Sequence, residues 1–197
     1  MSSYLQKYAA ITKPEALTIP ITRYVIVDKD VLAESQEAFD AAVALDILSN
    51  AICKRMTEHF GIQYQVFPLE GVWHLIDRKI GFSAPENIEG RMMIKQPLEL
   101  TEQLFEEIRI EVLQNNEEAN LAGCIKSARL QSNDAEKVIQ MLHIGSYTHE
   151  PATFAIMNEF ARRHGFDEKG EYHREIYLKD VRHAIPDKYE TILRQPQ

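Results

Sequence analysis

Apolar residues recur at steps of three and four between positions 36 and 60, which is the spacing of one face of an α-helix. Gly61 follows directly, at the position where a glycine in the left-handed region often ends a helix. The pattern therefore predicts an amphipathic helix from Gln36 to Phe60. Its apolar positions are Ala38, Ala41, Leu45, Leu48, Ile52, Met56 and Phe60.

Predicted strands flank this helix. Residues 19–27 form a run rich in β-branched side chains, and the polar turn at 28–30 ends it. After the helix, residues 63–67 and 71–76 read as two strands separated at Pro68, which has no amide hydrogen to donate to a sheet. The first part of the chain is thus predicted as strand, helix, strand, strand.

The same order returns near the C-terminus. Residues 138–144 are apolar, residues 151–164 carry a helical pattern, and Gly165 follows that pattern as Gly61 follows the first helix. A strand is then predicted over 172–178. The chain thus contains an internal repeat in the order of its predicted strands and helices, while the residue identities hardly repeat.

The segment between the repeats is predicted to contain one further helix. Thr101 is a suitable N-cap for a helix over residues 102–113. Residues 81–90 and 115–134 read as polar connections, and the second holds a short helix or strand around 121–130.

Composition narrows the classes of function. The chain has 197 residues, 45% of them hydrophobic, and a net charge of −8 without a cluster of Lys and Arg. This argues against binding to nucleic acid or to an anionic membrane surface. We expect a soluble, cytoplasmic protein, because the chain has no signal-peptide pattern and no window of ~20 apolar residues. Cys53 and Cys124 are far apart and are expected to be reduced thiols.

The sequence His173-Arg174-Glu175-Ile176-Tyr177 suggests a ligand site. A strand places Glu175 on one face with His173 and Tyr177, and an exposed strand has no need of a glutamate there. A pocket for a polar or cationic small molecule does need one. The turn at Gly145, with Tyr147 close behind, precedes this strand and is expected to border the same pocket.

Two carboxylates occupy similar positions in the repeats. Glu70 and Glu175 lie nine and ten residues after the glycine that ends each predicted helix, and each is followed by an aromatic residue, Trp73 or Tyr177. If the halves pack about a pseudo-two-fold axis, both acids are expected to face one central groove.

Other chemistries lack a matching motif. His143 and His149 are six residues apart and His173 and His183 ten, which are not the spacings of known zinc motifs. The chain also lacks a Gly-rich phosphate loop and a Gly-x-Ser-x-Gly elbow. We therefore expect neither a metal nor a cofactor.

Five ordered motifs resemble the GyrI-like small-molecule-binding proteins, and more narrowly their stand-alone branch, which includes hydrolases of cyclopropanoid genotoxins. The motifs are residues 63–73, residues 93–97, residues 143–147 with 150–153, residues 175–180 with Arg182, and residues 191–196. The resemblance implies an α+β fold with a duplicated strand-helix-strand-strand (SHS2) module. It also implies a curved antiparallel sheet, two helices on one face and a central cleft. The whole chain, residues 1–197, would form a single domain, with halves at approximately 17–100 and 135–197.

The resemblance also implies roles for five residues. Glu175 would activate or position water, Tyr147 would donate a hydrogen bond, and Glu70 would be a second carboxylate. Trp73 and Tyr177 would supply a surface for a planar ligand. Simpler interpretations stay open: Glu175 paired with Arg174 or Arg182, Trp73 in the core, Tyr147 closing its turn, and Glu70 in a solvated turn.

Three functions follow as hypotheses. The first is detoxification, in which the protein binds a planar aromatic toxin or drug and hydrolyses its strained ring. The second is sequestration of small aromatic or cationic molecules without turnover, as in multidrug binding. The third is a gyrase-interacting protection module. The sequence leaves the oligomeric state open.

Overall fold

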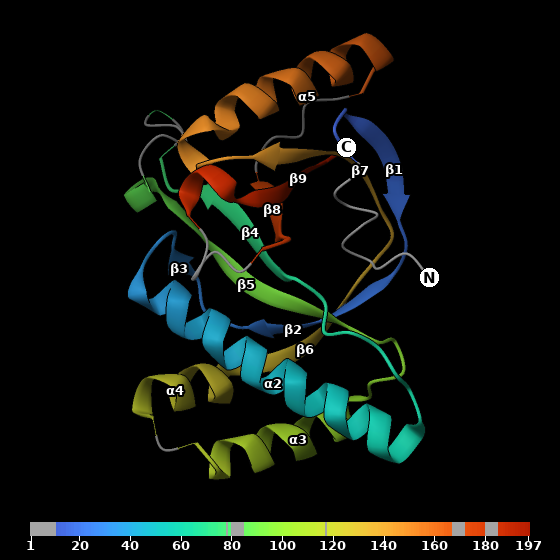
Figure 1. Cartoon of the computed structure of the whole chain (residues 1–197), viewed down its shortest axis with the longest axis vertical. Helices are drawn as coiled ribbons and strands as arrows, with labels where there is room; N and C mark the ends of the chain where they lie inside the picture. The colour runs from blue at the N-terminus through green and yellow to red at the C-terminus, as the bar shows by residue number, and fades with distance from the viewer. Residues whose placement is uncertain (1–10, 78, 80–84, 117, 167–171, 180–184) are drawn as a thin grey trace.

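A computed structural model describes residues 11–77, 79, 85–116, 118–166, 172–179 and 185–197, which form one nine-stranded antiparallel sheet with helices packed against it (Figure 1). The strands are β1 (Glu15–Ile19), β2 (Thr22–Val27), β3 (Val31–Leu32), β4 (Leu69–Leu75), β5 (Ile88–Gln96), β6 (Ala128–Asn133), β7 (Glu136–Ile144), β8 (Tyr172–Tyr177) and β9 (Glu190–Pro196). The α-helices are α2 (Gln36–Phe60), α3 (Glu102–Gln114), α4 (Ala119–Ser127) and α5 (Glu150–His164). Three short 3₁₀ helices are η1 (Pro85–Asn87), η2 (Tyr147–His149) and η3 (Pro186–Lys188).

The strand order is β1-β7-β9-β8-β4-β5-β2-β6, and β3 pairs with β5 outside this path. Six central strands, β7-β9-β8 and β4-β5-β2, come from two strand-helix-strand-strand segments that meet where β8 pairs with β4. The first strand of each segment lies farthest from this seam. The α+β class and the antiparallel sheet agree with the sequence prediction.

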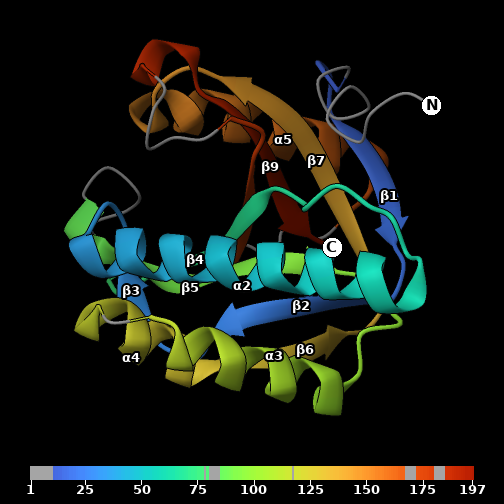
Figure 2. The ribbon, with the colours of Figure 1, turned by 60° about the horizontal axis from the view of Figure 1, so that its bottom comes forward.

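Helix α2 has the predicted bounds, and both of its ends are capped. The Ser35 side chain accepts a hydrogen bond from the Ala38 amide, and Gly61 ends the helix with a φ of 67° in the left-handed region. Leu45 and Leu48 on its apolar face are fully buried. This helix packs against β5 and, on another side, against α3 and α4 (Figure 2).

Helix α5 is built in the same way. It has a proline in its first turn, and Gly165 ends it with a φ of 71°. Met157 and Ala161 pack on Ile139 and Leu193 of the sheet. Helices α2 and α5 lie on the same face of the sheet, as the resemblance implied. Two side chains on one face of β8 show this: Tyr177 belongs to the core under α2, and His173 packs on Phe154 of α5.

The chain passes from β1 to β2 through only two residues, Pro20 and Ile21, although these strands lie near opposite ends of the sheet order. This short connection requires a strongly curved sheet, and Figure 2 shows β1 descending directly into β2. The strand predicted over 19–27 contains β2 and only the last residue of β1, so most of β1 was missed. Pro20 breaks that run because it cannot donate to a ladder.

Two other predictions need correction. Residues 63–67 do not form a strand, because both edges of the neighbouring β4 are already paired, with β5 and β8. Tyr64 and Phe67 from this segment pack on the hydrophobic core instead. The region around 121–130 is both a helix and a strand, since α4 ends at Ser127 and β6 starts at Ala128.

The helix predicted over 102–113 is α3, and the Thr101 side chain caps it by accepting a hydrogen bond from the Leu104 amide. None of the helices within the described ranges is long and apolar enough to cross a membrane.

Candidate functional site

Three alternate side chains of β8 point toward the helix-covered face of the sheet. His173, Glu175 and Tyr177 all belong to this face because successive strand residues point to opposite sides. All three are buried. His173 Nε2 lies 2.8 Å from Glu175 Oε1, which is the distance of a charge-assisted hydrogen bond. The strand thus holds the Glu175 carboxylate in a fixed orientation.

Trp73 lies beside this row, on β4. It pairs in register with His173, and its indole Nε1 donates a 2.9 Å hydrogen bond to the Tyr177 hydroxyl. The ring lies over two glycines: a Cβ at Gly71 would lie 2.6 Å from Trp73 Cε2, and one at Gly90 would lie 2.8 Å from Cε3. The glycines leave room for the indole, which is also part of the core under α2.

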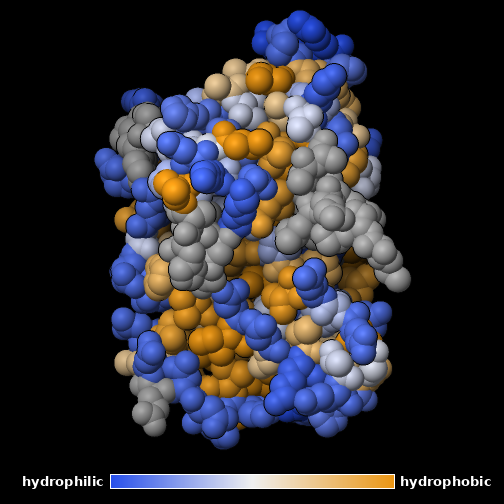
Figure 3. Space-filling view, viewed as in Figure 1, coloured by the Kyte–Doolittle hydropathy of each residue, from blue (hydrophilic) through white to orange (hydrophobic). Residues whose placement is uncertain are grey.

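Tyr147 brings a second phenol to this site from η2. Its ring meets Tyr177 edge to face, with centroids 6.4 Å apart, and lies 5.2 Å from the Tyr189 ring. Such aromatic contacts offer flat apolar surface together with hydroxyl groups. In Figure 3, hydrophobic side chains reach the surface over α2 and in the region between α2 and α5.

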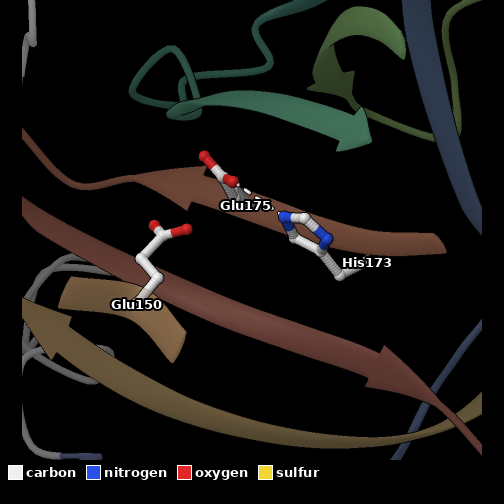
Figure 4. A group of neighbouring side chains, drawn as sticks. All are labelled: Glu150, His173 and Glu175. Atoms are coloured by element: carbon white, nitrogen blue, oxygen red, sulfur yellow. Dashed lines mark hydrogen bonds and ion pairs between the residues drawn. The ribbon is translucent and has the colours of Figure 1, made fainter. Parts of the chain in front are cut away.

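Glu150, in the first turn of α5, completes the group (Figure 4). One carboxylate oxygen of Glu150, one of Glu175 and one ring nitrogen of His173 all lie within 4.8 Å of one another. Burial and the negative charge of Glu175 raise the pKa of Glu150 to about 10. The carboxyl of Glu150 is therefore neutral at pH 7.

The phenols of the site are neutral as well. Burial, followed by the negative charge of Glu175, raises the pKa of both Tyr147 and Tyr177 above the ordinary value of a tyrosine. A hydrogen bond between Tyr177 and Glu175 acts in the same direction. The charges that shift these two phenols and Glu150 are all negative. The site thus combines neutral O–H donors with one carboxylate that His173 holds in place.

Glu70 does not join this group, so the prediction of two acids facing one groove is wrong. Glu70 pairs in register with Ile176, whereas the next residue, Gly71, pairs with Glu175. Because strand residues alternate, Glu70 and Glu175 lie on opposite faces of the sheet. The sequence spacing was correct for the repeat but gave the wrong face.

On its own face of the sheet, Glu70 is buried near the basic side chain of Arg174 and the aromatic side chain of Tyr24. Arg174 Nη1 lies 3.7 Å from Glu70 Oε2 and donates a 3.1 Å hydrogen bond to the Tyr24 hydroxyl. Burial raises the pKa of Glu70, and the positive charge of Arg174 partly opposes this effect. Arg174 therefore forms an ion pair with Glu70, and the interpretation that it pairs with Glu175 is wrong. Arg182, the other arginine considered for that pairing, lies outside the described residues.

Two members of the site were given no role by sequence reasoning. His173 was placed on the same strand face as Glu175, but it was not assigned to the site. Glu150 carried no such signal, because only the packing of α5 on the sheet brings its carboxyl to β8. Glu150 thus supplies the second carboxylate that the sequence had assigned to Glu70.

Solved structures place this fold among known proteins. An uncharacterized conserved protein from Listeria innocua superposes with a TM-score of 0.82 at 23% identity, over 98% of this chain and 96% of that one. A hydrolase from the same organism superposes with a TM-score of 0.80 at 24% identity, over 97% and 95%. The C-terminal domain of EcmrR gives a TM-score of 0.51 at 10% identity, over 94% and 97%. The chain has the GyrI-like fold.

The comparisons confirm the resemblance at the level of the fold. No family model matches the sequence, and no curated protein is similar to it. One of these solved proteins, from Listeria innocua, is described as a hydrolase.

Proposed function

We propose that this GyrI-like protein binds planar aromatic compounds between α2 and α5 and hydrolyses electrophilic cyclopropanoid compounds by adding water to the strained ring. One observation carries the proposal. The Glu175 carboxylate, held by His173 at 2.8 Å, lies beside a neutral Glu150 and among the rings of Trp73, Tyr177 and Tyr147.

The proposed reaction needs a base and an acid at one ligand. Glu175 takes a proton from water while the water oxygen bonds to a carbon of the cyclopropane. The strained carbon–carbon bond breaks, and its electron pair moves through the conjugated system to the ligand's carbonyl oxygen. That oxygen is stabilised by hydrogen bonding and takes a proton from the site.

Glu150 and Tyr147 are the proposed donors to the carbonyl oxygen. A carboxyl with a pKa of about 10 keeps its proton at pH 7, as a donor to an oxyanion must. Tyr147 is also neutral, because burial and the nearby acids raise its pKa. After the reaction, the proton that Glu175 gained must return to Glu150.

A second candidate function is sequestration without turnover. It is favoured by the uniformly negative charges that act on the phenols and on Glu150. Such a site attracts a cation, and aromatic rings bind cations through their faces. The two functions differ in whether the ligand leaves the protein chemically changed.

The first prediction tests turnover directly. The purified protein is incubated with an electrophilic cyclopropanoid compound, and the products are analysed by mass spectrometry for a gain of one water. We expect Glu175→Gln to lower kcat by about 10²- to 10⁴-fold, because it removes the base while keeping the shape of the side chain. Quenching of Trp73 fluorescence measures binding separately, and the affinity for an uncharged substrate should change little.

Glu107→Gln on the exposed side of α3 is the matched control and should keep full turnover. If the wild-type protein binds the compound and releases it unchanged, sequestration is the function. If Glu175→Gln keeps the full rate, the base is another residue.

A further inference from the structure

The buried group at the start of α5 also has the composition of a metal site. Glu150, His173 and Glu175 offer two carboxylate oxygens and one imidazole nitrogen, all within 4.8 Å of one another (Figure 4). The three residues come from the start of one helix and from one strand. Motif spacing along the chain predicted no metal, because such motifs record ligands that are close in sequence.

Glu150 gives a second, independent observation that points to a ligand. The residue is only 7% exposed, and its Oε1 has no hydrogen-bond partner among the described residues. Figure 4 shows its carboxylate pointing toward Glu175. A buried acid beside a second acid requires a proton or a cation to balance its charge.

We propose that Glu150, His173 and Glu175 bind one divalent first-row transition-metal ion of the Zn²⁺ or Co²⁺ type. One imidazole with two carboxylates suits these borderline ions, and three protein ligands leave a position open for water or a ligand. Ca²⁺ and Mg²⁺ fit less well, since both prefer an all-oxygen shell.

The surroundings of the three side chains are suited to holding them for an ion. His173 packs edge to face on Phe154, with ring centroids 4.9 Å apart, which fixes the plane of the imidazole. Tyr177 is hydrogen-bonded to Glu175 and accepts a hydrogen bond from Trp73. Contacts of this kind orient metal ligands in known sites.

A metal ion would compete with a proton in this site. The ion would take the place of the hydrogen between His173 Nε2 and Glu175, and Glu150 would release its proton. Affinity should therefore rise with pH, because binding of the ion releases protons from its ligands. The same ion would occupy Glu175 and so inhibit any hydrolysis that uses this carboxylate as a base.

The experiment uses the full chain after removal of metal with a chelator. Co²⁺ is titrated while visible absorption is recorded, and Zn²⁺ is titrated in a calorimeter at pH 6 and pH 8. We expect one ion per chain, with tighter binding at pH 8. Glu150→Gln and His173→Gln should each weaken binding by about tenfold or more. His59→Gln, at an exposed histidine of α2, should bind as the wild type does.

X-ray absorption of the wild-type Co²⁺ complex supplies a readout that needs no variant, and one imidazole ligand is expected. The proposal is overturned if the wild type does not bind one ion per chain. It is also overturned if His173→Gln binds the ion as tightly as the wild type, or if the bound ion has no imidazole ligand. These measurements require no turnover, so their outcome is separate from that of the hydrolase proposal.

Discussion

Glu150 and Glu175 form a pair of neighbouring buried carboxyl groups. Desolvation is the larger cause of the raised pKa of Glu150, and the charge of Glu175 raises it further. The His173 Nε2 lies 2.8 Å from Oε1 of the strand residue Glu175. The helix residue Glu150 therefore keeps its proton at pH 7, as a catalytic acid must.

This pair makes stability depend on pH. The pKa of Glu150 rises from 4.5 in the unfolded chain to about 10 in the folded one, so the folded chain binds more protons between these values. Stability is therefore lost as pH rises through this range. The side chain of glutamine does not titrate, so Glu150→Gln removes this dependence on pH. We expect this variant to raise the melting temperature at pH 8 by about 2–4 °C, which corresponds to about 1 kcal/mol in a chain of this size.

Calorimetry with a chelator present at pH 4 and pH 8 checks this prediction. The gain should vanish at pH 4, where both states of the wild type are protonated at this position, and Glu107→Gln should show no such dependence. A variant that is less stable than the wild type at pH 8 would show that Glu150 is charged and stabilised in the folded protein.

Sequence reasoning found part of the site at the level of residues. The structure brings together four of the predicted residues, Glu175, Tyr177, Trp73 and Tyr147. They could be predicted from the sequence because strand alternation and the turn after β7 are local features. Glu70 was misplaced because position in a repeat does not determine the face of a strand, which depends on register. A shift of one residue in register moves a side chain to the other side of the sheet.

At the level of elements, β4 positions the site through the packing of Trp73. The strand carries glycine at position 71 and tryptophan two residues later on the same face, and β5 carries Gly90 opposite Trp73. The indole fills the volume that the two missing side chains leave. Its Nε1 then reaches Tyr177 on β8, so the seam between the two halves is joined by a side-chain hydrogen bond as well as by the ladder.

Gly71→Ala should disrupt this packing. The new methyl group would overlap the indole atoms of Trp73, a rigid side chain that is itself buried. We expect a loss of about 1–3 kcal/mol, as for other overpacked cores, with a red shift of the Trp73 emission. Urea denaturation and fluorescence spectra provide the two measurements.

Gly123→Ala is the matched control. Gly123 is exposed in α4, and a Cβ there would meet no atom within 4 Å. This change should stabilise the protein by about 0.5–1 kcal/mol, because alanine is a better helix former than glycine. Equal effects of the two substitutions would contradict the assigned role of Gly71.

Helices were predicted more accurately than strands, for a physical reason. The bounds of α2 follow from residues near in sequence: Ser35 as the N-cap, a repeating apolar face and Gly61 as the stop. Residues 63–67 had an equally good strand pattern, but a strand needs a free partner, and β4 has none left. Pairing is a property of the whole sheet, which the local pattern does not contain.

At the level of the whole molecule, the two strand-helix-strand-strand segments share one sheet and one buried seam. Five residue pairs join β4 to β8, from Glu70 with Ile176 to His74 with Tyr172. The segment between the repeats adds α3, α4 and β6 beside α2, and within the described part of the chain it has no counterpart next to α5. Unequal halves on a continuous sheet suggest a single cooperative unit, and we propose that the chain unfolds as one.

The cooperativity of unfolding can be measured with one substitution in each half. Leu48 in α2 and Met157 in α5 are both fully buried, so each change to alanine should lower the free energy of unfolding by about 2–5 kcal/mol. Phe39 and Ile156 lie exposed on the same two helices, and their change to alanine should cost only about 0.5 kcal/mol or less. Urea unfolding is followed by far-ultraviolet circular dichroism for the helices and by Trp73 fluorescence for the seam.

If the sheet couples the halves, each core variant should shift a single transition, and the two probes should coincide at every urea concentration. The reason is geometric: the Trp73 indole belongs to the core under α2, and its hydrogen-bond partner Tyr177 lies on a strand that also contacts α5 through His173. Loss of either helix therefore exposes the same seam. Two separate transitions, with Met157→Ala moving only the one that leaves Trp73 fluorescence unchanged, would show instead that the halves fold independently.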